Sequence, residues 1–396
     1  MSEWQTFCLK DLGKIVGGAT PSTNNPKNYG NKIAWITPKD LSTLQGRYIK
    51  KGSRNISRLG FKSCSCVLLP KHAILFSSRA PIGYVAIAKK RLCTNQGFKN
   101  IIPNKKIYFE FLYYLLKYHK DNISNIGGGT TFKEVSGATL GLFKVKIPPT
   151  YYEQQKIART LSILDQKIEN NHKINELLHK ILELLYEQYF VRFDFLDENN
   201  KPYQTSGGKM KFSKELNRLI PSGWSVRFLN HKIVSTYQPK TISKTLLNDS
   251  YSYSVYGGGG IIGRFTEYNH EQSEFIISCR GQCGISYLTL PKSWITGNAM
   301  VIRPTKSYTS KTYLYHTIKK YKLTNYITGS VQPQITRQNL STMPILIPKR
   351  KTLNKWNNIS SLLWNLIHNN MQSTQTLTAL RDFLLPLLLK QQVKPQ

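Results

Sequence analysis

Lysine, arginine and glutamine are the residues of this chain whose types and spacing could do chemistry, and that chemistry is the binding of nucleic acid. Cations bind phosphates, and the paired donors and acceptors of arginine and glutamine match the edges of guanine and adenine. One stretch interleaves its cations with Tyr48 and with polar residues. Its predicted DNA contacts are Lys39, Arg47, Lys50, Lys51, Arg54 and Arg58.

Two further arginines, Arg79 and Arg280, occupy matching positions of an internal repeat, each flanked by small residues. Such a guanidinium could donate two hydrogen bonds to guanine or to a phosphate. It could equally be a buried group that stabilises a loop by hydrogen bonds. Arg264 is added to the predicted DNA contacts. The amides of Gln96, Gln332 and Gln334 suit adenine edges, although loop glutamines are often simply solvated.

The charge distribution supports a polyanionic partner. Residues 1–150 hold 24 Lys and Arg against 6 Asp and Glu, whereas residues 151–200 hold 6 against 9. Residues 201–396 hold 26 against 6, so two basic bodies flank a slightly acidic segment. A merely basic protein is the alternative. A membrane surface fits less well, because the charge is spread over whole domains and the apolar run 383–389 is too short to span a bilayer.

Catalytic patterns are missing from the sequence. Ile147-Pro148-Pro149-Thr150 lacks the Asn or Asp that amino-methyltransferases place before their prolines, and no phosphate-binding G-x-x-x-x-G-K-[ST] loop occurs. The histidines are scattered singly, and the six cysteines show no C-x-x-C spacing, which disfavours a zinc site and favours reduced thiols in the cytoplasm. With no signal peptide recognised after Met1, we expect a cytoplasmic binding protein with no catalytic or metal-binding residues.

The chain is duplicated at an offset of about 201 residues. The hexapeptide Ser78-Arg79-Ala80-Pro81-Ile82-Gly83 corresponds to Cys279-Arg280-Gly281-Gln282-Cys283-Gly284. The pentapeptide beginning at Cys93 likewise corresponds to the one beginning at Trp294. A repeat this long is a duplicated domain rather than a solenoid, and two similar modules suggest a target with two halves.

Each copy is predicted to be a mixed α/β body followed by a long helix. In the first copy, β-prone runs cover residues 32–36, 67–69 and 84–88. An amphipathic helix fits Tyr108 to Lys120, and Lys311 to Tyr321 is its partner in the second copy.

Two heptad seams predict the long helices, which we expect to pack antiparallel as a coiled-coil spacer. Polar residues within each seam would fix its register. Pro386 should bend or end the second helix near its last turn. The first seam contains Ile157, Leu161, Leu164, Ile168, Asn171, Asn175, Leu178 and Leu182. The second contains Leu363, Leu366, Asn370, Leu377, Leu380 and Leu384.

The resulting fold class is mixed α/β, with two similar α+β target-recognition domains, two long antiparallel helices and a pseudo-two-fold internal repeat. The predicted boundaries are a first domain at 1–150, a central spacer helix at 151–196, a connector at 197–219, a second domain at 220–350 and a C-terminal spacer helix at 351–396.

Several motifs resemble those of the specificity subunits of type I restriction–modification enzymes. They are Ile147-Pro148-Pro149, Glu153-Gln154-Gln155-Lys156-Ile157-Ala158, the run from Leu161 to Ile168, Asn95-Gln96-Gly97-Phe98, Gly207-Gly208-Lys209-Met210 and Ile220-Pro221-Ser222-Gly223-Trp224. The resemblance spans nearly the whole chain. The second spacer departs from the pattern, because residues 349–356 lack the Glu-Gln-x-x-Ile of the first.

The resemblance implies a non-catalytic subunit whose two domains each read one half of a split, asymmetric site on double-stranded DNA. The helices would set the distance between the halves and dock two methyltransferase subunits, which use S-adenosylmethionine to methylate adenine. Restriction subunits using ATP with Mg would translocate and cut the DNA. A self-sufficient nucleic-acid modification enzyme and a recognition subunit of a related bipartite restriction system remain the alternatives.

Overall fold

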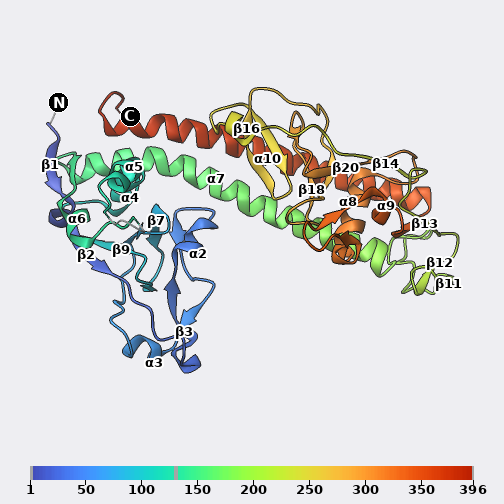
Figure 1. The fold of residues 1–396 in the computed structure, drawn as a ribbon, viewed down its shortest axis with the longest axis horizontal. Coiled ribbons are helices and arrows are strands. Elements are labelled where there is room, and N and C mark those ends of the chain that lie inside the picture. The colour runs from blue at the N-terminus through green and yellow to red at the C-terminus, as the bar shows by residue number, and fades with distance from the viewer. Residues whose placement is uncertain (1–2, 129–132, 395–396) are drawn as a thin grey trace. The chain divides into compact units, whose positions relative to one another are not determined.

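The structure, a computed structural model, describes residues 3–128 and 133–394. The chain forms two compact units, of which unit 1 comprises Met1–Lys173 with Gln372–Gln396, and unit 2 comprises Ile174–Met371. Each unit contains one α/β body and one part of each of two long helices, α7 (Tyr151–Tyr186) and α10 (Arg350–Leu389) (Figure 1). The units therefore divide both helices, whereas the sequence boundaries treat each helix as a separate segment.

In the residues that the structure describes, body 1, the part of unit 1 before α7, has three sheets, six short α-helices and a 3₁₀ helix at Pro26–Asn28. Its five-stranded sheet has the order β2-β9-β6-β7-β4, with β2 (Gly13–Gly17), β9 (Lys99–Pro103), β6 (Ile74–Ser78), β7 (Ile82–Ala88) and β4 (Tyr48–Ile49). A three-stranded sheet joins β5 (Asn55–Ile56), β3 (Tyr29–Ile36) and β8 (Cys93–Thr94), and β1 (Gln5–Cys8) pairs with β10 (Lys144–Ile147). The helices are α1 (Leu9–Leu12), α2 (Pro38–Ser42), α3 (Arg58–Lys62), α4 (Phe109–Tyr118), α5 (Lys120–Asn125) and α6 (Gly137–Leu142).

Body 2, residues 222–349, repeats this framework. Its four-stranded sheet has the order β14-β20-β17-β18, with β14 (Val234–Tyr237), β20 (Ala299–Pro304), β17 (Phe275–Ser278) and β18 (Ser286–Leu288). A three-stranded sheet joins β16 (Gly260–Phe265), β15 (Tyr253–Gly257) and β19 (Trp294–Ile295). The remaining strands are β13 (Ser225–Phe228) paired with β23 (Pro344–Ile347), and β21 (Ile327–Thr328) paired with β22 (Gln334–Ile335). The helices are α8 (Lys311–Lys320) and α9 (Arg337–Leu340).

The two bodies correspond strand by strand. The antiparallel pair β1–β10 is repeated as β13–β23, β2–β9 as β14–β20, and β6–β7 as β17–β18. The parallel pair β3–β8 is repeated as β15–β19. Strand β4, which extends the large sheet of body 1 through a parallel pairing with β7, has no counterpart in the large sheet that the structure describes for body 2. The duplication is therefore preserved in the framework and broken at this edge.

The two long helices pack antiparallel within each unit. In unit 1, Asn171 Nδ2 lies 3.2 Å from Thr374 Oγ1, and Arg381 Nη1 lies 2.8 Å from Asp165 Oδ1. In unit 2, Asn370 Nδ2 donates to Asn175 Oδ1 at 2.9 Å. Partners on α10 run backwards as positions on α7 advance, and the mid-seam asparagines bond across the pair as register-fixing residues should. In the part of the chain that the structure describes, no helix is long and apolar enough to cross a membrane.

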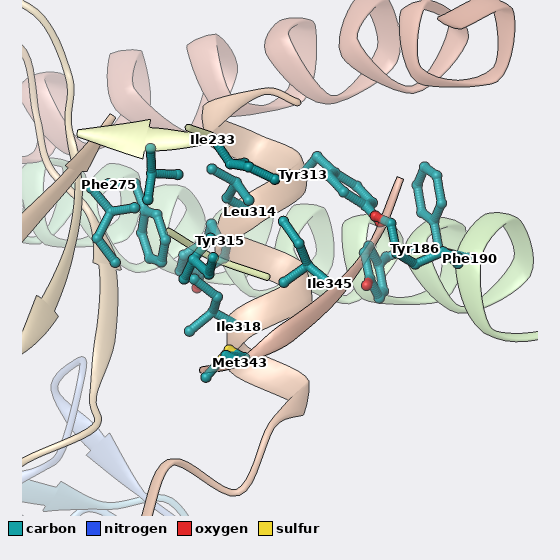
Figure 2. Close-up of a cluster of buried hydrophobic side chains, with 14 of the residues drawn as sticks. Tyr186, Phe190, Ile233, Phe275, Tyr313, Leu314, Tyr315, Ile318, Met343 and Ile345 are labelled. Atoms are coloured by element: carbon teal, nitrogen blue, oxygen red, sulfur yellow. The ribbon is translucent and has the colours of Figure 1, made fainter. Parts of the chain in front are cut away.

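One amphipathic helix in each body anchors the core. In body 1, α4 buries a run of six residues from Phe111 to Leu116. In body 2, α8 buries Thr312 to Ile318 and packs among residues from α7 and from strands of the body. Figure 2 shows Tyr313, Leu314 and Tyr315 of α8 within this cluster, with Tyr186 of α7 nearby. Each body is thus fixed to the long helices of its own unit by buried apolar contact.

Most of the predicted elements are confirmed. The runs at 32–36 and 84–88 lie in β3 and β7, and the two amphipathic helices are α4 and α8. The strand predicted at 67–69 is wrong, because this segment forms only an isolated bridge, Leu69 with Leu92. The connector contains a hairpin, β11 (Met210–Ser213) with β12 (Arg218–Pro221). Helix α10 continues through Pro386 and ends at Leu389, one turn later.

Candidate nucleic-acid interface

Three segments converge at the end of β6 in body 1, and the same three converge at the end of β17 in body 2. The backbone N–H of Ser78 donates to Gly97 O at 2.8 Å, and Val135 N donates to Ser78 O at 3.0 Å. In body 2, Cys279 N donates to Asn298 O at 3.0 Å and Ile335 N donates to Cys279 O at 3.0 Å. The duplication has therefore produced one loop cluster twice, with Arg79 and Arg280 each directly after the residue that joins the segments, Ser78 and Cys279.

A buried serine holds the turn that presents each arginine. Ser77 Oγ donates to Pro81 O at 2.8 Å and accepts from Tyr84 N at 2.8 Å. Ser278 Oγ donates to Gln282 O and accepts from Ile285 N at 2.9 Å. Because one hydroxyl closes the turn at both ends, the backbone that carries each arginine has little freedom.

Arg79 lies at the surface with its side chain 37% exposed. Its Nη1 is 3.4 Å from Glu134 Oε2, and the other oxygen of Glu134 lies 3.1 Å from Lys99 Nζ. Two cations therefore share one carboxylate, and the site keeps a net positive charge. The nearby Gln96 is exposed and accepts a hydrogen bond from Thr20 Oγ1 through its side-chain oxygen. The structure brings Arg79 and Gln96 into the same loop cluster.

Arg280 is exposed and forms no ion pair with any described residue. Its backbone forms an antiparallel bridge with Gln334, so the β21–β22 hairpin, which also exposes Gln332, lies beside it. Arg264 is outside this group, on β16, where its Nη1 donates to Tyr251 O at 3.0 Å. The structure thus assembles Arg280, Gln332 and Gln334 and leaves Arg264 apart.

The predicted DNA contacts between Lys39 and Arg58 in body 1 differ in their exposure to solvent. Lys39 on α2, Lys50 and Lys51 after β4, and Arg58 at the start of α3 are exposed. Arg54 is also exposed, and its guanidinium lies 3.4 Å from the centre of the Tyr29 ring, a cation–π contact that orients it.

Arg47 is the exception. It was predicted to contact DNA, but it is buried among carboxylates. Its side chain is 3% exposed, with Nη1 3.0 Å from Glu110 and Nε 3.2 Å from Glu169. Burial opposes its charge, but Tyr114, Glu169 and Glu110 outweigh that effect and raise the pKa of Arg47. A guanidinium surrounded by carboxylates in the core is not presented to DNA, so Arg47 is removed from the interface.

A buried charge cluster at the base of body 1 was missed by sequence reasoning. Asp165 of α7 accepts from Tyr114 Oη at 2.5 Å and from Arg381 of α10 at 2.8 Å, and Arg47 Nε lies 4.0 Å away. The side chain of Asp165 is 5% exposed. The available signals were an acid next to the seam residue Leu164 of α7 and an arginine next to the seam residue Leu380 of α10. This cluster joins body 1 to both long helices of unit 1.

The predicted seam residues of α7 are buried or partly buried, whereas two of those predicted in α10 are exposed. In α7, Ile157, Leu161, Ile168 and Leu182 are buried, Leu164 and Leu178 are partly buried, and Asn171 and Asn175 bond across the pair. In α10, Leu363, Asn370, Leu377 and Leu384 are partly buried. Leu366 and Leu380 are 44% and 43% exposed, because the neighbouring Ile367 and Arg381 face the interior instead.

The described residues, 3–128 and 133–394, include no group of three or more His, Cys, Asp or Glu side chains placed to hold a metal ion. All six cysteines are free. The chemistry of the loop clusters is therefore that of guanidinium, ammonium and amide groups, which bind phosphates and base edges.

Comparison with known proteins agrees with this arrangement. The family model for the type I restriction modification DNA specificity domain matches residues 1–180 and 221–380, once for each copy. The MjaIX type I restriction enzyme specificity subunit of Methanocaldococcus jannaschii is 33% identical over 98% of this chain and 92% of its own length. The HindI specificity subunit of Haemophilus influenzae is 31% identical over 46% of this chain and 40% of its own. The crystal structure of the S subunit from M. genitalium has a TM-score of 0.58 at 18% identity and covers 97% of this chain and 96% of its own, which supports the fold.

Proposed function

Because this chain belongs to the family of type I restriction–modification specificity subunits, we propose that each of its two bodies reads one half of a bipartite, asymmetric DNA target. The chain is a non-catalytic DNA-recognition subunit, and family membership decides against a self-sufficient modification enzyme. The observation that carries the bipartite proposal is the duplicated loop cluster, with one arginine at the same place in each copy.

Differences between the two clusters support an asymmetric target. The cluster of body 1 contains an acid, Glu134, shared by Arg79 and Lys99. The cluster of body 2 instead joins the backbone of Arg280 to that of Gln334, whose exposed side chain is a carboxamide. A carboxylate and a carboxamide present different acceptors and donors, so the two bodies should prefer different base pairs.

Exchange of one body tests this proposal. Replacing residues 220–350 with the corresponding domain of a relative should change one half of the methylated target and leave the other intact. Methylated adenines would be mapped in DNA modified by the complete methyltransferase complex. A change in both halves at once would overturn the assignment of one half-site to each body.

We further propose that methyltransferase subunits dock on the long helices. Four apolar residues on one face of α7 in unit 2 are exposed: Ile174, Leu177, Ile181 and Leu184 at 47%, 60%, 45% and 56%. Their spacing of three and four residues makes a continuous stripe, the pattern by which one helix packs against another. S-adenosylmethionine would bind the methyltransferase partners, and ATP with Mg would serve the restriction subunits.

The double variant L177K/L184K tests the docking stripe. Both side chains are exposed, so the charges should leave the fold intact and abolish co-purification with the methyltransferase. The matched control is Leu219→Lys, since Leu219 is 55% exposed in the connector hairpin. Retention of the methyltransferase by L177K/L184K would place the docking surface elsewhere.

A further inference from the structure

Six exposed cations gather at one edge of the large sheet of body 1. They lie in three segments: Lys50 and Lys51 after β4, Lys71 before β6, and Lys89, Lys90 and Arg91 after β7. We call this group the β4 basic edge. Only Lys50 and Lys51 were among the sequence-predicted DNA contacts.

Backbone hydrogen bonds bring the three segments together. Strand β4 pairs in parallel with β7, so that Ile49 lies opposite Ala88, and Lys89 N donates to Ile49 O at 2.9 Å. His72 N donates to Ala88 O at 2.9 Å, which places the turn containing Lys71 against the end of β7. The cations are therefore neighbours in the fold although up to 41 positions separate them in the sequence.

The charge of this edge is not compensated within the chain. No described carboxylate lies within 4.0 Å of any of the six cations. Acids of the adjoining elements are already engaged: Glu110 accepts from Arg47 at 3.0 Å and from Tyr48 at 2.5 Å. Asp40 accepts from the backbone of Thr37 and of Ser53, each at 2.7 Å. Six like charges repel one another, and a polyanion would relieve that repulsion.

The second copy of the framework has no equivalent edge. Body 2 lacks a described counterpart of β4, and the positions about 201 residues later hold one cation, Lys292. The others are Tyr251, Ser252, Gln272, Leu290 and Pro291. Because the shared framework folds without these charges in body 2, their presence in body 1 serves something other than the fold.

We infer that the β4 basic edge is a sequence-independent binding site for the phosphate backbone of double-stranded DNA, outside the bases read by body 1. Strand β6 separates this edge from Arg79, since Lys71 precedes the strand and Arg79 follows it. Five residues of strand span about 17 Å, which is about five base-pair steps along a duplex. Flexible lysines carry a point charge and lack the planar pair of donors by which arginine recognises a base. The edge therefore adds affinity for DNA rather than sequence specificity.

This inference rests on the proposed DNA-recognition function, and a charge-neutralising triple variant tests it. K89Q/K90Q/R91Q would be compared with the parent in the complete complex with the methyltransferase, using a duplex that lacks the target. Loss of three phosphate contacts should reduce the slope of log affinity against log salt by about 2.7. Between 50 and 200 mM salt, the parent should then lose about 40-fold more affinity than the variant.

The matched control is K209Q/K211Q/K214Q, which removes the same charge from three exposed lysines of the connector. It should leave the slope near that of the parent, and the methylated target should be unchanged in both variants. If the slope of log affinity against log salt fell equally for both triple variants, the effect would come from net charge alone, and the proposed binding site would be wrong. Loss of the methyltransferase subunit from K89Q/K90Q/R91Q, with DNA affinity unchanged, would show instead that the edge binds an acidic protein surface. Failure of the half-site proposal would appear separately, as a body exchange that leaves the target unaltered.

Discussion

Replacing Asp165 with asparagine should destabilise unit 1 far more than removal of an exposed acid. The carboxylate is 5% exposed and accepts hydrogen bonds from Tyr114 at 2.5 Å and from Arg381 at 2.8 Å. Arg47 Nε lies 4.0 Å away. Removing one partner of a buried ion pair costs about 3–5 kcal/mol, because the remaining charge stays buried without its counterion. Arg47 keeps two other carboxylates, so we expect the lower end of that range, about 3 kcal/mol.

Hydrogen exchange read by mass spectrometry measures this loss by region. Since 1.4 kcal/mol is a factor of ten, amides of unit 1 that exchange through its unfolding should exchange about 100-fold faster. The control is Asp382→Asn, whose side chain is 56% exposed and lies 2.8 Å from the same Arg381. An exposed pair contributes about 0–1 kcal/mol, so this control should change exchange by fivefold at most. Equal effects of the two substitutions would refute the reasoning that burial sets the strength of the cluster.

Three further predictions concern recognition, pH and spacing. Arg280→Ala should cost about 1–3 kcal/mol on the cognate half-site if the arginine reads a base, whereas an equal loss on all sequences in a binding titration would mark a phosphate contact. Burial lowers the pKa of His316 to about 3 from 6.5, so its neutral form stabilises unit 2 above pH 6.5. That contribution should fall by up to about 1.4 kcal/mol per pH unit as pH drops toward 3. Urea unfolding at several pH values measures this effect. His316→Phe should make the free energy of unfolding depend less on pH, whereas replacement of the exposed His231 should not. One heptad added to each long helix, within 164–178 and 366–380, should widen the gap between the half-sites by at most about three base pairs, because each residue adds about 1.5 Å. Mapping of methylated sites measures this gap. An active variant with an unaltered gap would show that the helices do not set the spacing.

The repeat and the long helices could be predicted because their signals are local. A heptad of apolar residues defines one face of α7 without reference to any other element. The mid-seam Asn171 and Asn175, predicted to fix the register, bond across the pair. The sequence does not fix the frame of α10, since apolar residues occupy adjacent positions such as Leu366 and Ile367. The surfaces of α7 and of body 2, against which α10 packs, decide which of the two faces inward, and they are not encoded in the pattern of α10.

Burial of charge was the main feature that the sequence concealed. Arg47 lies among exposed cations in the sequence, yet it is enclosed by Glu110 and Glu169, which are 63 and 122 positions away. A local pattern cannot reveal partners at such separations, because any arginine within a basic run has the same local signature. Arg79 and Arg280 were easier to select, since duplication marks equivalent positions without knowledge of their contacts.

The attachment of each body to its helices also bears on how such chains diversify by recombination. In unit 1 a buried charge cluster reinforces the apolar attachment, so an incoming body without equivalents of Arg47 and Tyr114 would leave Asp165 paired with Arg381 alone. In unit 2 the residues at corresponding positions are Tyr315, Ile367 and His179, with Trp364 packed 5.3 Å from Tyr315 and 5.0 Å from His179. Tyr315 brings no charge to this place, and the ion pairs of body 2 with α7, Lys319 with Glu183 and Lys320 with Glu187, are largely exposed. An incoming body therefore needs an aromatic residue of similar size here and no buried ion pair. Gene exchange should therefore replace the second body more freely than the first, and new specificities in descendants of this chain should arise mainly in that half.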